Sequence, residues 1–128
     1  MNLFTFRKVC TTQSWAAWGF GLALLFFPDR LIQLMGLQPE QGLLLVSRLA
    51  GAMMFALGSV LHTVRNDISM TNRRTICGSN GSVDAAMAIL FAKAAYNSVT
   101  NVWGYVFAGL FAVNAATWAI AYFYKKEG

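Results

Sequence analysis

The chain has 128 residues, of which 57% are hydrophobic and only 12% are charged. Soluble domains carry about 25% charged residues, so this composition excludes an ordinary soluble domain and predicts an integral membrane protein. The net charge of +5 comes from small basic clusters beside apolar runs, which excludes a nucleic-acid-binding stripe. Since a membrane-spanning helix needs about 20 mostly apolar residues, we expect one all-α domain, residues 1–128, with four spans and no soluble part.

The first apolar run predicts a span over about 12–27. Pro28 ends it, because proline removes a hydrogen bond inside a helix but is tolerated in the first helical turn. The segment PDRLIQLMGL therefore predicts a short interfacial helix that begins at Pro28 and stops at Gly36, before the second span.

The second run, about 41–64, contains an arginine in otherwise apolar sequence. Arg48 flanks a small-residue stripe of Ser47, Gly51 and Gly58, so we expect it to face the bundle while the leucine-rich side faces lipid. The helix still inserts, because a central arginine costs about 2.5–3.5 kcal/mol and the apolar residues together return more. His62, near the end of the run, is a candidate axial ligand for a haem or chlorophyll metal, with a polar interfacial role as the alternative.

The mostly apolar part of the third span, VDAAMAILFAKAAY, is only fourteen residues long. A full crossing, about 75–97, must begin near Thr75 and include the polar CGSNGS segment, which is tolerated only against protein or water. Alternatively, the helix starts late, with Ser82 as its N-cap and Asp84 in its first turn. The fourth span, about 101–124, is uninterrupted.

Basic residues predict the topology. Seven of the ten fall on one side of a four-span arrangement: Arg7, Lys8, Arg65, Arg73, Arg74, Lys125 and Lys126. The positive-inside rule then places both termini and the 65–74 loop in the cytoplasm or its organellar equivalent. We expect a multi-pass protein of a bacterial inner membrane or an organellar membrane.

Three intramembrane polar residues are the candidate site. If the third span begins near Thr75, Asp84 and Asn114 lie about level, roughly 19 Å below the outer boundary, and Arg48 lies roughly 10 Å below it. This spacing predicts a buried cluster of Arg48, Asp84 and Asn114; a late start of the helix would dissolve it. A structural ion pair, binding of a lipid or quinone headgroup, and ion conduction remain alternative roles.

Small residues at helical spacing predict close helix packing, either within the bundle or between chains. They are Ser47, Gly51, Gly58, Ala88, Ala92, Gly104, Ala108 and Ala112.

The sequence contains few other residues that could carry catalysis or bind a metal or cofactor. No metal-ligand constellation, phosphate-binding loop or nucleophile with an adjacent base occurs in the sequence, so we expect no enzyme and no metal site. Cys10 and Cys77 are expected to be inert thiols. We predict no cofactor; a lipid, a quinone or a pigment are the candidate bound molecules.

Residues 12–65 contain W-x-x-W-G, then FFPDRLIQLMGL, then SRLAGAMMFALGSVLHTVR. This order resembles small four-helix membrane proteins of the DoxX-like type. The matching positions are Pro28, Gly36, Leu37, Arg48, Leu49 and Gly51. The resemblance implies a four-helix bundle, in some members associated with respiratory or redox membrane complexes, and it supplies no catalytic residue.

Two functions follow as expectations. The first is a non-catalytic accessory subunit that packs on other subunits of a larger respiratory or photosynthetic membrane complex. The alternative is a small oligomeric protein that transports a solute, or binds a lipid or quinone, around Arg48. A polar cleft at the predicted cluster favours the second function, and a dry ion pair there favours the first.

Overall fold

A computed structural model describes residues 3–67 and 69–123, which form helices and no strands. The helices are α1 (Leu3–Phe26), α2 (Pro28–Leu34), α3 (Gln41–Val64), α4 (Met70–Tyr96) and α5 (Val102–Phe123). The predicted all-α class is confirmed. Two helices, α3 and α5, are long and apolar enough to cross a membrane. Lys125 and Lys126, on which the predicted topology partly rests, lie outside the described residues.

The break between α1 and α2 follows the proline rule. Helix α1 begins earlier than the predicted span and ends at Phe26, and Pro28 occupies the first turn of α2. Gly36 ends α2 with a φ of 80°, where the Gly36 and Leu37 N–H groups donate to the carbonyls of Gln33 and Ile32, at 2.9 and 3.1 Å. This is the usual left-handed glycine cap of a helix C-terminus. The short helix predicted after the first span is therefore present.

Helix α4 begins at Met70, neither near Thr75 nor at Ser82. The Ser69 side chain caps it by accepting a hydrogen bond from the Asn72 N–H at 3.3 Å. Asp67 supports the same turn, because its carboxylate accepts from the Asn72 amide at 2.9 Å and from the Ser69 N–H at 2.7 Å. These two hydrogen bonds hold the pKa of the exposed Asp67 carboxyl below its ordinary value.

The polar GSNGS segment is helical because its side chains bond to carbonyls of their own helix. Asn80 donates to the Ile76 carbonyl at 2.9 Å, and Ser82 donates to the Gly78 carbonyl at 2.8 Å. Ser82 thus lies inside α4, and Asp84 lies in the middle of a 27-residue helix and not at its start.

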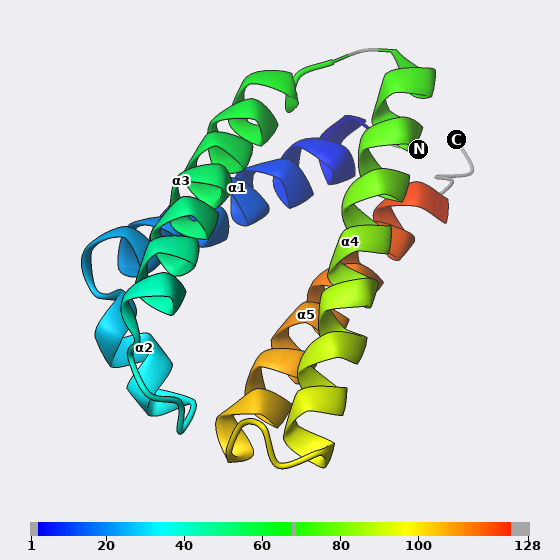
Figure 1. Cartoon of the computed structure of the whole chain (residues 1–128). Coiled ribbons are helices and arrows are strands. Elements are labelled where there is room, and N and C mark those ends of the chain that lie inside the picture. The colour runs from blue at the N-terminus through cyan, green and yellow to red at the C-terminus, as the bar shows by residue number, and fades with distance from the viewer. Residues whose placement is uncertain (1–2, 68, 124–128) are drawn as a thin grey trace.

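The helices form two pairs, α1 with α3 and α4 with α5 (Figure 1). Glycines allow α1 and α3 to approach closely. A Cβ on Gly51 would lie 2.7 Å from the Gly21 carbonyl oxygen, and a Cβ on Gly58 would lie 2.7 Å from a Trp18 ring carbon. Each distance is well inside van der Waals contact, so only glycine fits at Gly51 and Gly58.

The second pair packs through aromatic rings and one small-residue contact. Phe91 of α4 stacks on Phe111 of α5, with ring centroids 5.6 Å apart. Near the α4–α5 loop, Gly104 lies against Ala95 and Thr100. The pair is thereby held along its length.

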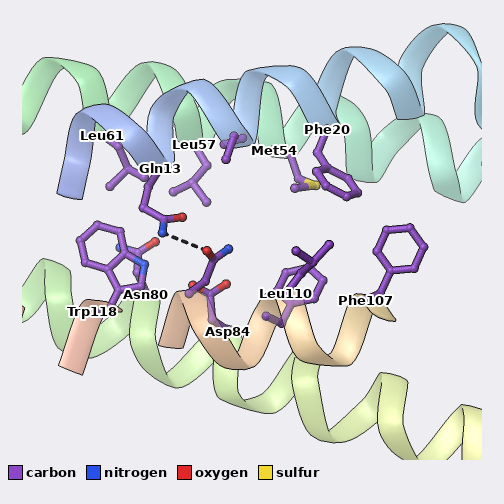
Figure 2. A pocket seen from close by; sticks show the side chains of 14 residues that line it. Gln13, Phe20, Met54, Leu57, Leu61, Asn80, Asp84, Phe107, Leu110 and Trp118 are labelled. Atoms are coloured by element: carbon purple, nitrogen blue, oxygen red, sulfur yellow. Dashed lines mark hydrogen bonds between the residues drawn. The ribbon is translucent and has the colours of Figure 1, made fainter. Parts of the chain in front are cut away.

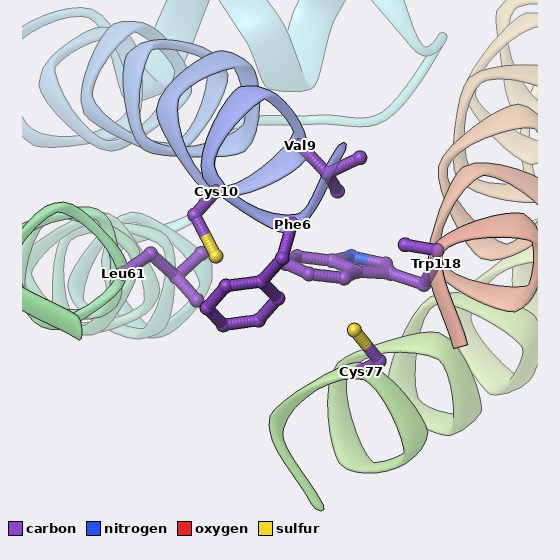
Figure 3. Close-up of a cluster of buried hydrophobic side chains, with 7 residues drawn as sticks. Phe6, Val9, Cys10, Leu61, Cys77 and Trp118 are labelled. Atoms are coloured by element: carbon purple, nitrogen blue, oxygen red, sulfur yellow. The ribbon is translucent and has the colours of Figure 1, made fainter. Parts of the chain in front are cut away.

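The pairs meet at two ends. At one, which we call the cysteine end, all four long helices contribute to a buried cluster whose side chains point toward one another (Figure 3). Its members are Phe6, Val9, Cys10, Leu61, Cys77, Trp118 and Ala121. At the other, the α2 end, Asn101 donates from its side chain to the Leu34 carbonyl at 2.8 Å and from its N–H to the Met35 carbonyl at 3.0 Å.

We predict that Gly51→Ala lowers the stability of the protein by about 1–3 kcal/mol, because the added methyl group forces α1 and α3 apart. The matched control is Gly19→Ala in α1, where a Cβ meets nothing within 4 Å. Alanine there is expected to raise helix stability by about 0.5–1 kcal/mol. Thermal unfolding in detergent checks both variants, and a similar melting temperature for the two would contradict the close glycine contact.

Candidate functional site

A polar cavity of about 170 Å³ lies between the two helix pairs (Figure 2). Four polar side chains converge on it: Gln13 from α1, Asn80 and Asp84 from α4, and Asn114 from α5. The rest of its lining is apolar or aromatic and includes Trp118. A largely apolar cavity with a few convergent polar groups is typical of a small-molecule site.

Helix geometry and one hydrogen bond position the polar side chains. Asn80 and Asp84 are four residues apart on the continuous α4, so they lie on one face. Gln13, which is 8% exposed, donates from Nε2 to the Asn114 Oδ1 at 3.1 Å. This bond links α1 to α5 across the cavity and satisfies two amides that lie away from bulk water.

Among the described residues, Asp84 is the only one with a charged side chain in the lining of the polar cavity. It is half-buried, and the Trp118 indole N–H gives it a hydrogen bond. No lysine, arginine or histidine of the described residues lines the same cavity. An unpaired carboxylate at such a site is costly to keep, which marks it as a functional candidate.

A second, apolar cavity of about 430 Å³ adjoins the polar one toward the α2 end. Four side chains border both cavities, namely Phe20, Met54, Phe107 and Phe111. Beyond them the apolar cavity is lined mainly by α2, α3 and α4, including Leu31, Ile32, Val46, Ala50, Met87 and Ala94. The two cavities are neighbours separated by these shared side chains, one with polar groups in its lining and the other almost wholly apolar.

Arg48 is not part of the polar cluster, which corrects the expectation that it faces Asp84 and Asn114. It is exposed, and it lines neither cavity. Helix geometry explains the difference. Leu57, which lines the polar cavity, is nine residues after Arg48 on α3. Since each residue of a helix advances by about 100°, the two side chains point in opposite directions. Asp84 and Asn114 do meet at one cavity, with Gln13 and Asn80 as their neighbours.

His62 lies in the contact between α1 and α3. Its ring centroid is 5.2 Å from that of Trp18, and its buried Nδ1 has no hydrogen-bond partner among the described residues. His62 lines neither cavity, and no group of three or more metal-binding side chains occurs among the described residues.

The predicted packing residues fall into different environments. Gly51, Gly58, Gly104 and Ala108 are buried, whereas Ala112 is exposed. Three others are partly buried: Ser47, which lines the apolar cavity, Ala88 and Ala92. Cys10 and Cys77 are both buried as free thiols at the cysteine end.

Gln13 and Asn80 were not among the residues expected from the sequence. The signal for Asn80 is its spacing of four residues from Asp84, which becomes informative only if one helix runs through GSNGS. The signal for Gln13 is weaker, because a single glutamine near the start of an apolar run is also typical of an interfacial position.

No protein-family model, no curated protein and no solved structure matches the chain. The DoxX-like resemblance therefore stays a prediction.

We predict that Asn114→Ala destabilises the protein by about 1–3 kcal/mol, because it leaves the buried Gln13 amide without its partner. The control is Ser82→Ala, an exposed position in α4, for which a change within about 0.5 kcal/mol is expected. Chemical unfolding in detergent measures both. Equal stability of the two variants would show that the Gln13–Asn114 bond does not hold the helix pairs together.

Proposed function

We propose that the chain is a non-catalytic membrane protein that holds one amphiphilic molecule between its two helix pairs. The observation that carries the proposal is the junction of the polar and apolar cavities at Phe20, Met54, Phe107 and Phe111. A ligand with its headgroup at Asp84 and its tail in the apolar cavity matches this division of polarity. Single-tailed lipids and isoprenoid quinols both combine a polar headgroup with one apolar tail.

The size of the apolar cavity supports a tail as its occupant. At about 430 Å³, it falls within the range of about 300–1,000 Å³ that is usual for small-molecule pockets. Apolar side chains from α2, α3, α4 and α5 form almost all of its lining. A flexible hydrocarbon chain gains from such a space through burial alone, with no need for directional contacts.

The membrane setting of this proposal comprises four spans, with both termini and the 65–74 loop on the cytoplasmic side. Large apolar side chains on the outward surfaces of the long helices support it. They include Leu22, Leu49, Met53, Ile89, Leu90, Val113 and Ile120, all at least 43% exposed. So much exposed apolar surface suits contact with lipid or with other membrane proteins.

A second candidate function is that of an accessory subunit of a larger membrane complex. The outward side of α3 favours it, because Arg48 is exposed there beside Leu45 and Leu49, which are 61% and 57% exposed. An arginine at this depth is stabilised by a carboxylate or headgroup supplied from outside the chain. The DoxX-like resemblance suggests a respiratory or redox complex as the host.

We predict that Ala50→Phe reduces the amount of amphiphile that co-purifies with the protein several-fold, because the ring fills the apolar cavity that Ala50 lines. Stability should hold, since the ring takes the place of the tail in the apolar cavity. The measurement is mass spectrometry of molecules extracted from the purified protein, with the melting temperature recorded in parallel.

The matched control is Ala56→Phe on the same helix, at an exposed position that lines neither cavity. It should retain the ligand at the level of the unmodified protein. The binding proposal fails if the unmodified protein carries no amphiphile near one per chain, or if the two variants retain it equally.

The accessory-subunit candidate is tested on a native gel of membranes solubilised in mild detergent. Migration in a large multi-subunit particle is expected, and Arg48→Leu should shift protein to the free form, because it removes the exposed charge. The control is Arg30→Leu, which removes an exposed arginine of α2 in place of the one in α3. This variant should leave the particle intact. Migration of the unmodified protein as a small oligomer without other subunits would exclude this function.

A further inference from the structure

The polar cavity contains a negative charge without a positive one, and the proposed function leaves open the charge of the headgroup that binds there. Asp84 brings a carboxylate into it, and no side chain of the lining brings a positive charge. The nearest basic residue along α4, Lys93, is nine residues away, which puts it half a turn around the helix from Asp84. Arg48 points away from the cavity on α3, as described above.

The neighbouring amides do not balance this charge. The Gln13 amide donates to Asn114, and the Asn80 amide donates to the Ile76 carbonyl. Within the residues that the structure describes, the neutral Trp118 indole is the hydrogen-bond donor to Asp84. The carboxylate is therefore hydrogen-bonded but has no counter-ion within the described part of the chain.

We infer that the amphiphile held between the helix pairs carries a protonated amine as its headgroup, with Asp84 as the counter-ion. The inference rests on the proposed function and names its ligand class. An ammonium group donates three hydrogen bonds, so it suits a carboxylate with amide oxygens nearby. A carboxylate headgroup would meet like charge at Asp84, whereas an ammonium group supplies the counter-ion that the cavity lacks.

The volumes agree with a small headgroup on a single chain. The polar cavity, at about 170 Å³, is smaller than the apolar cavity beside it, at about 430 Å³. Figure 2 shows the Asp84 side chain directed into the space between the pairs, near the Gln13–Asn114 bond. From there the tail passes between Phe20 and Phe107, whose ring centroids lie 5.7 Å apart and whose side chains border both cavities.

The test uses three probes with the same tail: dodecylamine, dodecanol and dodecanoate. Equilibrium binding of each radiolabelled probe to the full chain in detergent is measured against protein-free micelles. Dodecylamine is expected to bind about tenfold or more tightly than dodecanol, because a hydrogen bond to a charged group contributes that factor or more. Dodecanoate is expected to bind most weakly of the three.

Two variants locate the preference at Asp84. Asp84→Asn should bring dodecylamine to the affinity of dodecanol while the affinity for dodecanol stays the same, which also shows that the variant is folded. Asp84→Glu keeps the charge and should keep the preference for the amine.

The outcomes separate the two proposals. Equal binding of amine and alcohol to the unmodified protein, or an amine preference that survives in Asp84→Asn, overturns the inference and leaves the proposed function standing. Binding of none of the three probes above the micelle blank, together with an empty protein in the co-purification experiment, overturns both.

Discussion

The close contact between α1 and α3 at Gly21, Gly51 and Gly58 fixes the orientation of the other functional positions. Because α1 turns its glycine and Trp18 side toward α3, the adjacent flank with Gln13, Ala17 and Phe20 lies toward α5. That flank forms one wall of the polar cavity. A larger residue at either glycine would rotate or displace this wall, so packing and binding depend on the same contact.

A continuous α4 is the second constraint, and it depends on a cap and on side chains that bond to their own helix. If the helix began at Ser82, Asp84 would lie in its first turn and the carboxylate would reach water. The cap at Ser69 instead places Asp84 between the helix pairs, where burial makes its charge costly. The proposed amine ligand offsets that cost with a counter-ion, and the dipoles of Trp118 and the amides assist it.

Helix α3 has different roles on its two sides. Met54, Leu57 and Leu61 line the polar cavity, while Arg48 and Leu49 are exposed on the outside. A ligand between the pairs and a protein neighbour on the outer side of α3 would therefore not compete for the same surface. The two functions that we propose are compatible in one molecule.

Composition and local chemistry in the sequence determined the all-α class and the α1–α2 break at Pro28, because apolar run length and proline geometry act within a few residues. Gly51 and Gly58 likewise predicted that α3 packs closely against another helix. The outward direction of Arg48 came from the tertiary structure. The start of α4, by contrast, is set by a local cap, since Asp67, Ser69 and Asn72 are close neighbours in the sequence. Which flank of a helix faces its partner depends on contacts with segments far along the chain. Helical spacing alone placed Arg48 beside the packing stripe and predicted that it faces the bundle, whereas it is exposed on the outer side of α3. The meeting of Gln13 with Asn114 is of the same kind, since it joins residues 101 positions apart.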